Sequence, residues 1–230
     1  MTNAARWLPA LIVASAMLAI ANGSWALDHR ALLFAFKPLT TLLIIAHAWR
    51  RGAETPSVRR FVLGGLWLSL VGDVLLLWPQ SGFVPGLVAF LIAHVLYTIA
   101  FASEQRFAAQ PAALAVYALI AGTILALLWG DIPPGLRIPV AAYVLALTAM
   151  AAQAAVVGLR TKGDDVRRAR GLMIGGALFM ASDTVLAVNR FALPVPAAGL
   201  WILATYWAAQ WLIASWLRPA PALPSAATSP

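Results

Sequence analysis

The sequence predicts an all-α fold: a polytopic membrane protein built as one bundle of eight transmembrane helices. Composition is the first reason, because 62% of the 230 residues are hydrophobic and only 10% are charged, unlike the balance of a soluble domain. The second reason is that apolar runs long enough to cross a hydrocarbon core of about 30 Å recur along the chain. Since lipid offers no hydrogen-bond partners to the backbone, these runs must be helical.

Each apolar run ends at charged or turn-forming residues. In chain order the separating segments are "DHR", "RRGAETPSVRR", "PQSG", "EQRFAAQ", "GDIPPGL", "RTKGDDVRRA" and "FALPVPA". Such short connections leave no room for a soluble domain. The expected spans are 7–27, 31–49, 61–79, 83–103, 111–129, 137–159, 170–190 and 198–217.

The spans form one predicted domain, 1–217, followed by a tail, 218–230. The tail "RPAPALPSAATSP" is rich in Pro, Ala and Ser and has almost no charge, so we expect it to be disordered. The first run also fits a cleavable secretory signal, with Arg6 before it and Ser-Trp-Ala at 24–26. That alternative would leave seven spans and place the two termini on opposite sides.

The distribution of Lys and Arg predicts the orientation, because basic residues stay on the cytoplasmic side. With eight spans, the N-terminus, the even-numbered connections and the C-terminus share one side. The other side holds only Arg30, Arg137 and Arg190. Both termini should therefore be cytoplasmic, and a bacterial inner membrane is the expected location. The basic side holds Arg6, Arg50, Arg51, Arg59, Arg60, Arg106, Arg160, Lys162, Arg167, Arg168, Arg170 and Arg218.

Composition also excludes several kinds of function. The chain has no cysteine, which removes disulfides, thiolate nucleophiles and cysteine-ligated metals. The net charge of +8 lies in loops beside membrane spans, where it suits anionic lipid head groups rather than nucleic acid. We expect membrane lipids as neighbours, no nucleic-acid partner and no cofactor or metal, and the oligomeric state stays open.

Few ionisable residues fall inside the spans, and each would be costly facing lipid. They are Lys37, Asp73, His94, Asp183 and, near a cytoplasmic end, His47. At 1.5 Å per residue, Lys37, Asp73 and Asp183 lie roughly 9 to 11 Å from the outer ends of their helices, with Tyr206 and His94 at roughly 12 and 16 Å. Five helices thus place polar groups in one layer, which predicts a shared cavity that opens outward.

Helical spacing adds further candidates for binding a substrate. His94 and Tyr97 share one stripe of the fourth span, Tyr206 and Gln210 share a face of the eighth, and Ser182 and Asn189 share one of the seventh. A structural reading stays open, in which Lys37 only pairs with an aspartate and the tyrosines only bridge helices. We expect Gly64, Gly65, Gly175 and Gly176 to be sites of close helix packing.

Charge counting predicts a division of labour between the two aspartates. Lys37 can neutralise one carboxylate, and a second ionised carboxylate in the same low-dielectric cavity is strongly disfavoured. One aspartate should therefore keep its proton near neutral pH while the other is ionised. This is the arrangement that general acid and base catalysis uses in hydrolysis, although spacing alone does not say which aspartate takes which role.

Five motifs in order along the chain resemble the YhhN family of membrane lysoplasmalogenases. They are "KP" at 37, "SLVGD" at 69–73, "FLIAHVLY" at 90–97, "GALFMASD" at 176–183 and "YWAAQWLIA" at 206–214. The resemblance implies hydrolysis of the vinyl ether of a lysoplasmalogen to a fatty aldehyde and a glycerophospho-head group. It implies catalytic roles for Asp73 and Asp183. Substrate-binding positions carried over are Lys37, His94, Tyr97, Ser182, Tyr206 and Gln210, while Asn189 rests on helical spacing alone.

Two alternatives to this function stay open at the level of sequence. A proton- or ion-coupled transporter would also use paired intramembrane acids and a lysine, but it needs a second polar half-pathway on the inner side, which is nearly bare here. A zinc-dependent intramembrane hydrolase needs several converging histidines, and only His94 lies deep. Lys37 is a candidate partner either for the substrate phosphate or for an aspartate.

Overall fold

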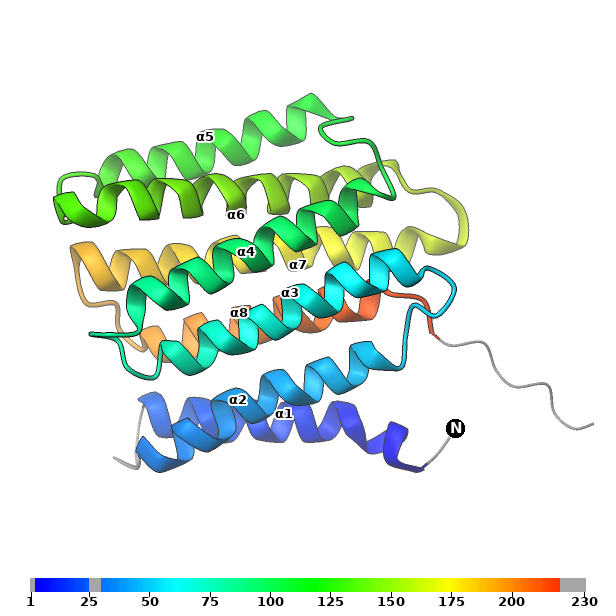
Figure 1. Ribbon diagram of the computed structural model, residues 1–230, viewed down its shortest axis with the longest axis horizontal. Helices are drawn as coiled ribbons and strands as arrows, with labels where there is room; N and C mark the ends of the chain where they lie inside the picture. Colours follow the sequence, from blue (N-terminus) through cyan, green and yellow to red (C-terminus); the bar gives the residue numbers. More distant parts are fainter. Residues whose placement is uncertain (1–2, 25–29, 220–230) are drawn as a thin grey trace, which may run out of the picture.

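The computed structural model describes residues 3–24 and 30–219, and long helices dominate them (Figure 1). The predicted all-α fold is confirmed. Each expected apolar run corresponds to one helix, and two short helical turns flank the seventh. In chain order these are α1 (Asn3–Ser24), α2 (Arg30–Trp49), α3 (Pro56–Leu75), α4 (Phe83–Ala102), α5 (Pro111–Leu128), α6 (Pro134–Arg160), η1 (Gly163–Asp165), α7 (Val166–Ala187), the π-helix η2 (Val188–Ala192) and α8 (Ala198–Trp216).

The long helices lie side by side along one direction, and α1 begins at the same end of the bundle at which α8 ends (Figure 1). Helices α3, α4, α6, α7 and α8 form the centre, where α7 packs against both α6 and α8, and α3 packs against α4. At one edge α5 packs on α6, and at the other α1 packs on α2. A cavity between the central helices and α5 therefore has a single helix as its outer wall.

Five helices are long and apolar enough to cross a membrane by length and composition: α2, α4, α5, α6 and α7 with its flanking turns. Helix α3 carries Asp73 and two arginines, and α8 carries Tyr206, Gln210 and four tryptophans, which lower the mean hydropathy of each helix. Asp73 and Gln210 are buried in the bundle, and their polarity is not presented to lipid. Mean hydropathy therefore understates how well these two helices suit a membrane.

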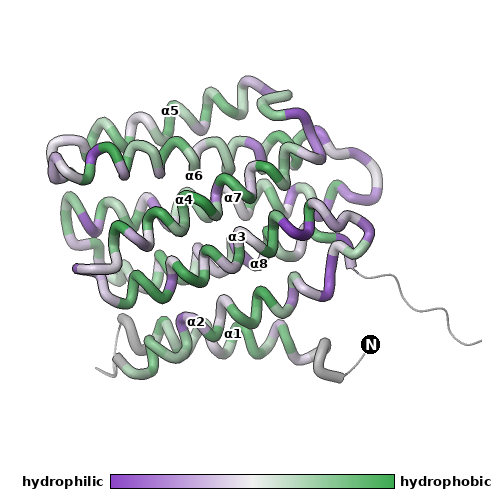
Figure 2. The backbone as a smooth tube through the Cα atoms, in the orientation of Figure 1, coloured by the Kyte–Doolittle hydropathy of each residue, from purple (hydrophilic) through white to green (hydrophobic). Residues whose placement is uncertain are grey.

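The outer surface of the bundle suits a hydrocarbon environment. Large apolar side chains stand exposed on α5 and α6, with Leu127 75% exposed and Ile138 82% exposed. Hydrophilic residues gather in the loops at the end where α1 begins, while the helices are mostly hydrophobic (Figure 2). Exposed leucine and isoleucine on this scale would be unfavourable in water and are expected facing lipid.

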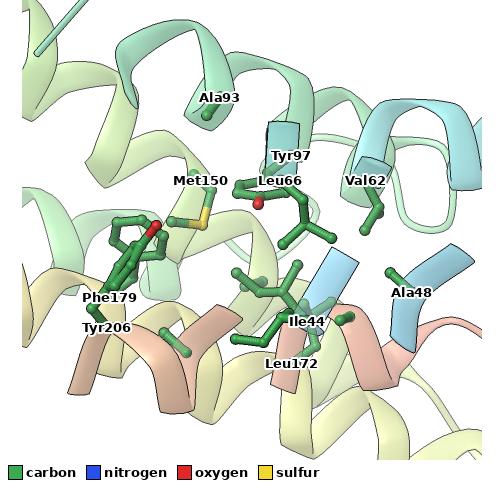
Figure 3. Packing of buried hydrophobic residues seen from close by; sticks show 14 of the residues in the cluster. Ile44, Ala48, Val62, Leu66, Ala93, Tyr97, Met150, Leu172, Phe179 and Tyr206 are labelled. Carbon is green, nitrogen blue, oxygen red and sulfur yellow. The ribbon is translucent and has the colours of Figure 1, made fainter. Parts of the chain in front are cut away.

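Glycines bring the central helices into close contact, as their positions predict. A Cβ added at Gly176 would lie 2.9 Å from the Cβ of Ala154 on α6, and one at Gly175 would lie 3.1 Å from that of Leu212 on α8. A Cβ at Gly65 would overlap the ring of Tyr97, and one at Gly72 the ring of Phe90. Large buried side chains of α3, α4, α6, α7 and α8 gather between these helices, with Phe179 beside Tyr206 (Figure 3).

Several helix boundaries differ from the sequence-based prediction. Helix α3 runs from Pro56 to Leu75 rather than from 61 to 79, so Asp73 lies about 3 Å along the axis from the end of its helix rather than about 9 Å. Helix α6 begins at Pro134 rather than at 137, because proline is well suited to the first turn of a helix. Helix α7 begins at Val166 rather than at 170, since a helix can continue through charged residues beyond its apolar run. Arg218, predicted to open the disordered tail, is held by its carbonyl, which accepts a hydrogen bond from Gly52 N at 2.7 Å. Residues 220–230 of that tail lie outside the described residues.

Candidate active site

A cavity of about 390 Å³ lies inside the bundle, and helices α2 to α8 all contribute to its wall. It reaches the end of the bundle opposite the basic loops, where Pro79, Phe83, Ile132 and Asn189 line it. Its polar groups include Lys37, Asp73, Asp183 and Tyr206, and most of its remaining surface is aliphatic or aromatic. The cavity is thus amphiphilic, with its two carboxyl groups set among apolar walls.

Asp73 has more polar neighbours than Asp183 does. It is 2% exposed, and its Oδ2 accepts hydrogen bonds from Thr41 Oγ1 at 2.7 Å and from the Tyr206 hydroxyl at 2.8 Å. Lys37 Nζ lies 3.7 Å from the other oxygen, Oδ1. A buried carboxylate with a cation and two donors around it is stabilised in its ionised form.

A line of hydrogen bonds extends from Asp73 into the bundle. The Tyr97 hydroxyl donates to Gln210 Oε1 at 2.8 Å, and Gln210 Nε2 donates to the Tyr206 hydroxyl at 3.2 Å, which in turn donates to Asp73. Every donor in this line points toward the carboxylate. Such a chain strengthens each of its bonds in a low-dielectric interior, and it fixes the orientation of Asp73 and Tyr206.

Asp183 has a different environment, although it lines the same cavity. Its Oδ2 accepts a hydrogen bond from the Tyr143 hydroxyl on α6. Within the described part of the chain, no Lys or Arg lies within ion-pair distance of its carboxyl. An acid at this depth without a cation is stabilised as the neutral form, because burial disfavours the charged one.

The remaining predicted site residues divide between the lining and the layer behind it. Ser182 and Asn189 line the cavity. The Ser182 hydroxyl donates to the Ile202 carbonyl at 3.0 Å, and Asn189 Oδ1 accepts from Val195 N at 3.0 Å, so both fasten the α7–α8 corner. Tyr97 and Gln210 lie behind Tyr206 and do not line the cavity. The fold therefore brings these four residues to one region, two in the cavity wall and two behind it.

His94 lies in the layer behind the cavity wall. It is fully buried, and its ring packs edge-on against Tyr143 and Phe179, with centroid distances of 5.2 and 4.7 Å. Neither ring nitrogen has a hydrogen-bond partner in the described part of the chain. Across residues 3–24 and 30–219, no three His, Asp or Glu side chains gather closely enough to hold a metal ion.

Sequence reasoning did not identify Tyr143 or Thr41, the donors to the two aspartates. Tyr143 lies nine residues into α6, about 13 Å from the end where that helix begins, close to the depth predicted for the polar layer. Thr41 lies one turn after Lys37 on the same face of α2. Depth and helical spacing could have found both, but uncharged hydroxyl groups occur in many spans without such a role.

The fold and the cavity define a class: multi-pass membrane proteins with a buried acidic site. The chain belongs to the YhhN family, whose model matches residues 32–217, and this confirms the resemblance that the motifs predict. No solved structure matches significantly.

Curated relatives carry the name of an enzyme. Human "Lysoplasmalogenase TMEM86B" is 41% identical over 156 residues, which is 65% of this chain and 60% of that protein. The rat protein of the same name is 32% identical, over 90% of this chain and 82% of its own length. "Lysoplasmalogenase" of Mycobacterium tuberculosis is 33% identical, over 85% of this chain and 74% of its own length. The chain thus spans under two thirds of the length of the human protein.

Proposed function

We propose that this chain is a lysoplasmalogenase that hydrolyses the vinyl ether bond of a lysoplasmalogen to a fatty aldehyde and a glycerophospho-head group. The observation that carries the proposal is one cavity holding two carboxyl groups in opposite environments. Asp73 has a cation and two hydrogen-bond donors, and Asp183 has a single tyrosine donor. The names of the relatives support the same reaction.

The shape and lining of the cavity suit a lipid with one chain. Leu87 on α4, Leu125 on α5 and Leu147 on α6 offer apolar surface to an alkenyl chain. Helix α5 lies at the edge of the bundle and packs on α6, so a chain could pass from the membrane between α5 and α4. The head group would then stay at the mouth, near Asn189, where the cavity meets the end of the bundle.

Asp183 is the proposed acid. A neutral carboxyl group has one hydroxyl and one carbonyl oxygen, and an oxygen that accepts a bond from Tyr143 serves as the carbonyl. The proton is then on Oδ1, the oxygen left for the substrate. Its transfer to the vinyl carbon remote from the ether oxygen breaks the double bond and gives an oxocarbenium ion, and no covalent bond to the protein is needed.

Asp73 is the proposed base. Its negative charge stabilises the cation, and it takes a proton from the water that adds to the carbon bearing the ether oxygen. In the resulting hemiacetal, the ionised Asp183 removes the hydroxyl proton while Asp73 returns its proton to the departing ether oxygen. The carbon–oxygen bond breaks, aldehyde and alcohol leave, and both aspartates regain their starting states.

Aldehyde release from a lysoplasmenyl lipid by the purified protein tests the proposal. Asp183→Asn and Asp73→Asn should each lower the rate by at least about 100-fold, the usual range for a lost general acid or base. Asp131→Asn, in the exposed α5–α6 turn, is the matched control and should retain the wild-type rate. Full activity in both cavity variants would refute the mechanism.

The transporter alternative makes a different prediction in the same preparation. Reconstituted protein would move a lipid or ion across vesicles without releasing aldehyde. We favour the hydrolase because the curated relatives reported above are named for it. We further propose that all eight long helices cross the membrane, with both termini cytoplasmic in a bacterial inner membrane.

A further inference from the structure

The mouth of the cavity contains a cation that the proposed reaction does not use. The described lining includes two basic side chains, Lys37 and Arg190. Lys37 is 9% exposed and lies 3.7 Å from Asp73, so it is committed to that carboxylate. Arg190 is exposed at the mouth, and the described part of the chain places no carboxylate within ion-pair distance of it.

The local structure holds Arg190 at this position. It lies in the π-helix Val188–Ala192, which follows α7 directly, and π-helical turns of this kind are frequent at functional sites. Its guanidinium carbon lies 4.9 Å from the centre of the Phe83 ring on α4. Stacking on an aromatic ring orients the guanidinium plane, so Arg190 is directed across the mouth between α7 and α4.

The spacing between Arg190 and the proposed acid matches the substrate. Arg190 follows Asp183 by seven residues, which is about 10 Å along a helix axis. Seven covalent bonds separate the vinyl carbon that accepts the proton from the phosphorus of a lysoplasmalogen, and they extend about 8 Å at roughly 1.2 Å per bond. With a further ~3 Å for the contact between acid and carbon, the phosphate reaches the level of Arg190.

We propose that Arg190 binds the phosphate of the lysophospholipid and makes the enzyme selective for phosphorylated substrates. The guanidinium offers paired N–H donors that match two phosphate oxygens, a geometry that lysine does not provide. This assignment rests on the proposed function, and it replaces Lys37 as the phosphate-binding candidate that the sequence suggests. The reacting bond is then set beside Asp183 by a contact at the opposite end of the glycerol.

Arg190→Gln tests this with two substrates, a lysoplasmenyl-ethanolamine and the 1-O-alkenylglycerol that lacks the phosphate. The variant should raise KM for the phospholipid by on the order of 10-fold and leave both kcat and KM for the alkenylglycerol unchanged. Arg190→Lys should recover part of the affinity, because the charge remains. An equal loss on both substrates, or no loss on either, would overturn the assignment.

Arg137→Gln is the matched control. Arg137 is also stacked on an aromatic ring, that of Trp129 at 5.4 Å, at the same end of the bundle, but it does not line the cavity. This variant should resemble wild type with both substrates. Inorganic phosphate should compete only weakly against the phospholipid, and strong competition would identify Arg190 as a site for free phosphate instead.

A binding measurement separates this inference from the proposed function. An alkyl-ether lysophospholipid cannot undergo vinyl ether hydrolysis, so its affinity reports the phosphate contact without turnover. Wild type should bind it on the order of 10-fold more tightly than Arg190→Gln does, whether or not the enzyme cleaves lysoplasmalogens. Equal affinities would refute the role of Arg190, while an inactive wild type with the expected difference in binding would refute only the reaction.

Discussion

Two residues of the same type acquire different chemistry here through their neighbours. Asp73 faces Lys37, Thr41 and Tyr206, whereas Asp183 faces Tyr143. The Tyr143 hydroxyl keeps one oxygen of Asp183 occupied and directs the other to the cavity. Tyr143→Phe should therefore reduce kcat about 10-fold, equivalent to about 1.4 kcal/mol of barrier, with little change in KM.

Rates of aldehyde release over a range of substrate concentrations check this prediction. Tyr117→Phe on α5 removes a hydroxyl that is half-buried and away from the cavity lining, and it should behave as wild type. An unaltered kcat in Tyr143→Phe would mean that Asp183 needs no hydroxyl to orient it.

The buried pair of Lys37 and Asp73 gives a prediction about stability. Lys37→Met leaves a carboxylate without its cation, and breaking a buried ion pair on one side costs about 3 to 5 kcal/mol. We expect a clear fall in the thermal unfolding midpoint in detergent. The double variant Lys37→Met/Asp73→Asn removes both charges and should regain most of that midpoint while remaining inactive, and additive losses would show that the pair is not coupled.

Packing between α3 and α4 shows how an element positions the site. Gly72 precedes Asp73, and its missing side chain leaves the space that the ring of Phe90 fills. Gly72→Ala must push the two helices apart or displace the ring, and it should lower both the unfolding midpoint and the activity. The double variant Gly72→Ala/Phe90→Leu should recover part of the loss, because leucine needs less room.

Gly122→Ala on α5 is the control for this prediction. A Cβ at Gly122 meets nothing within 4 Å, and alanine is favoured over glycine in a helix interior by roughly 0.5 to 1 kcal/mol. Its midpoint should stay level or rise. A normal midpoint and rate in Gly72→Ala would show that the α3–α4 contact tolerates expansion.

Helical positions and most depths were predictable from the sequence, because apolar runs set the helices and the rise per residue sets the depth. Asp73 is the exception, since α3 ends four residues before its apolar run does. The packing and hydrogen-bond partners of each side chain were not predictable, because they depend on how each helix is rotated about its axis relative to its neighbours. Phe90, His94 and Tyr97, spaced i, i+4 and i+7 along one face of α4, illustrate this. Phe90 lines the cavity, His94 packs against Tyr143, and Tyr97 bonds to Gln210, so one regular pattern serves three surroundings.

At the scale of the whole molecule, the eight-span topology depends on whether helix α3 crosses the membrane. Its mean hydropathy is lowered by Asp73 and by arginines near its start, yet Asp73, close to the end of the helix, is buried and faces the cavity. We expect α3 to cross the membrane, with the α2–α3 connection on the cytoplasmic side and the α3–α4 turn outside. The α5–α6 turn should then also be outside.

Single cysteines can map these connections directly, because the natural sequence contains none. Ala53→Cys, Ser81→Cys and Gly130→Cys each place a thiol at an exposed position in one connection. A membrane-impermeant maleimide should label the second and third in intact spheroplasts, and Ala53→Cys only after permeabilisation. Labelling of Ala53→Cys and Ser81→Cys from the same side would mean that α3 does not cross. The reverse pattern would invert the bundle and place the mouth of the cavity, with Arg190, on the cytoplasmic side.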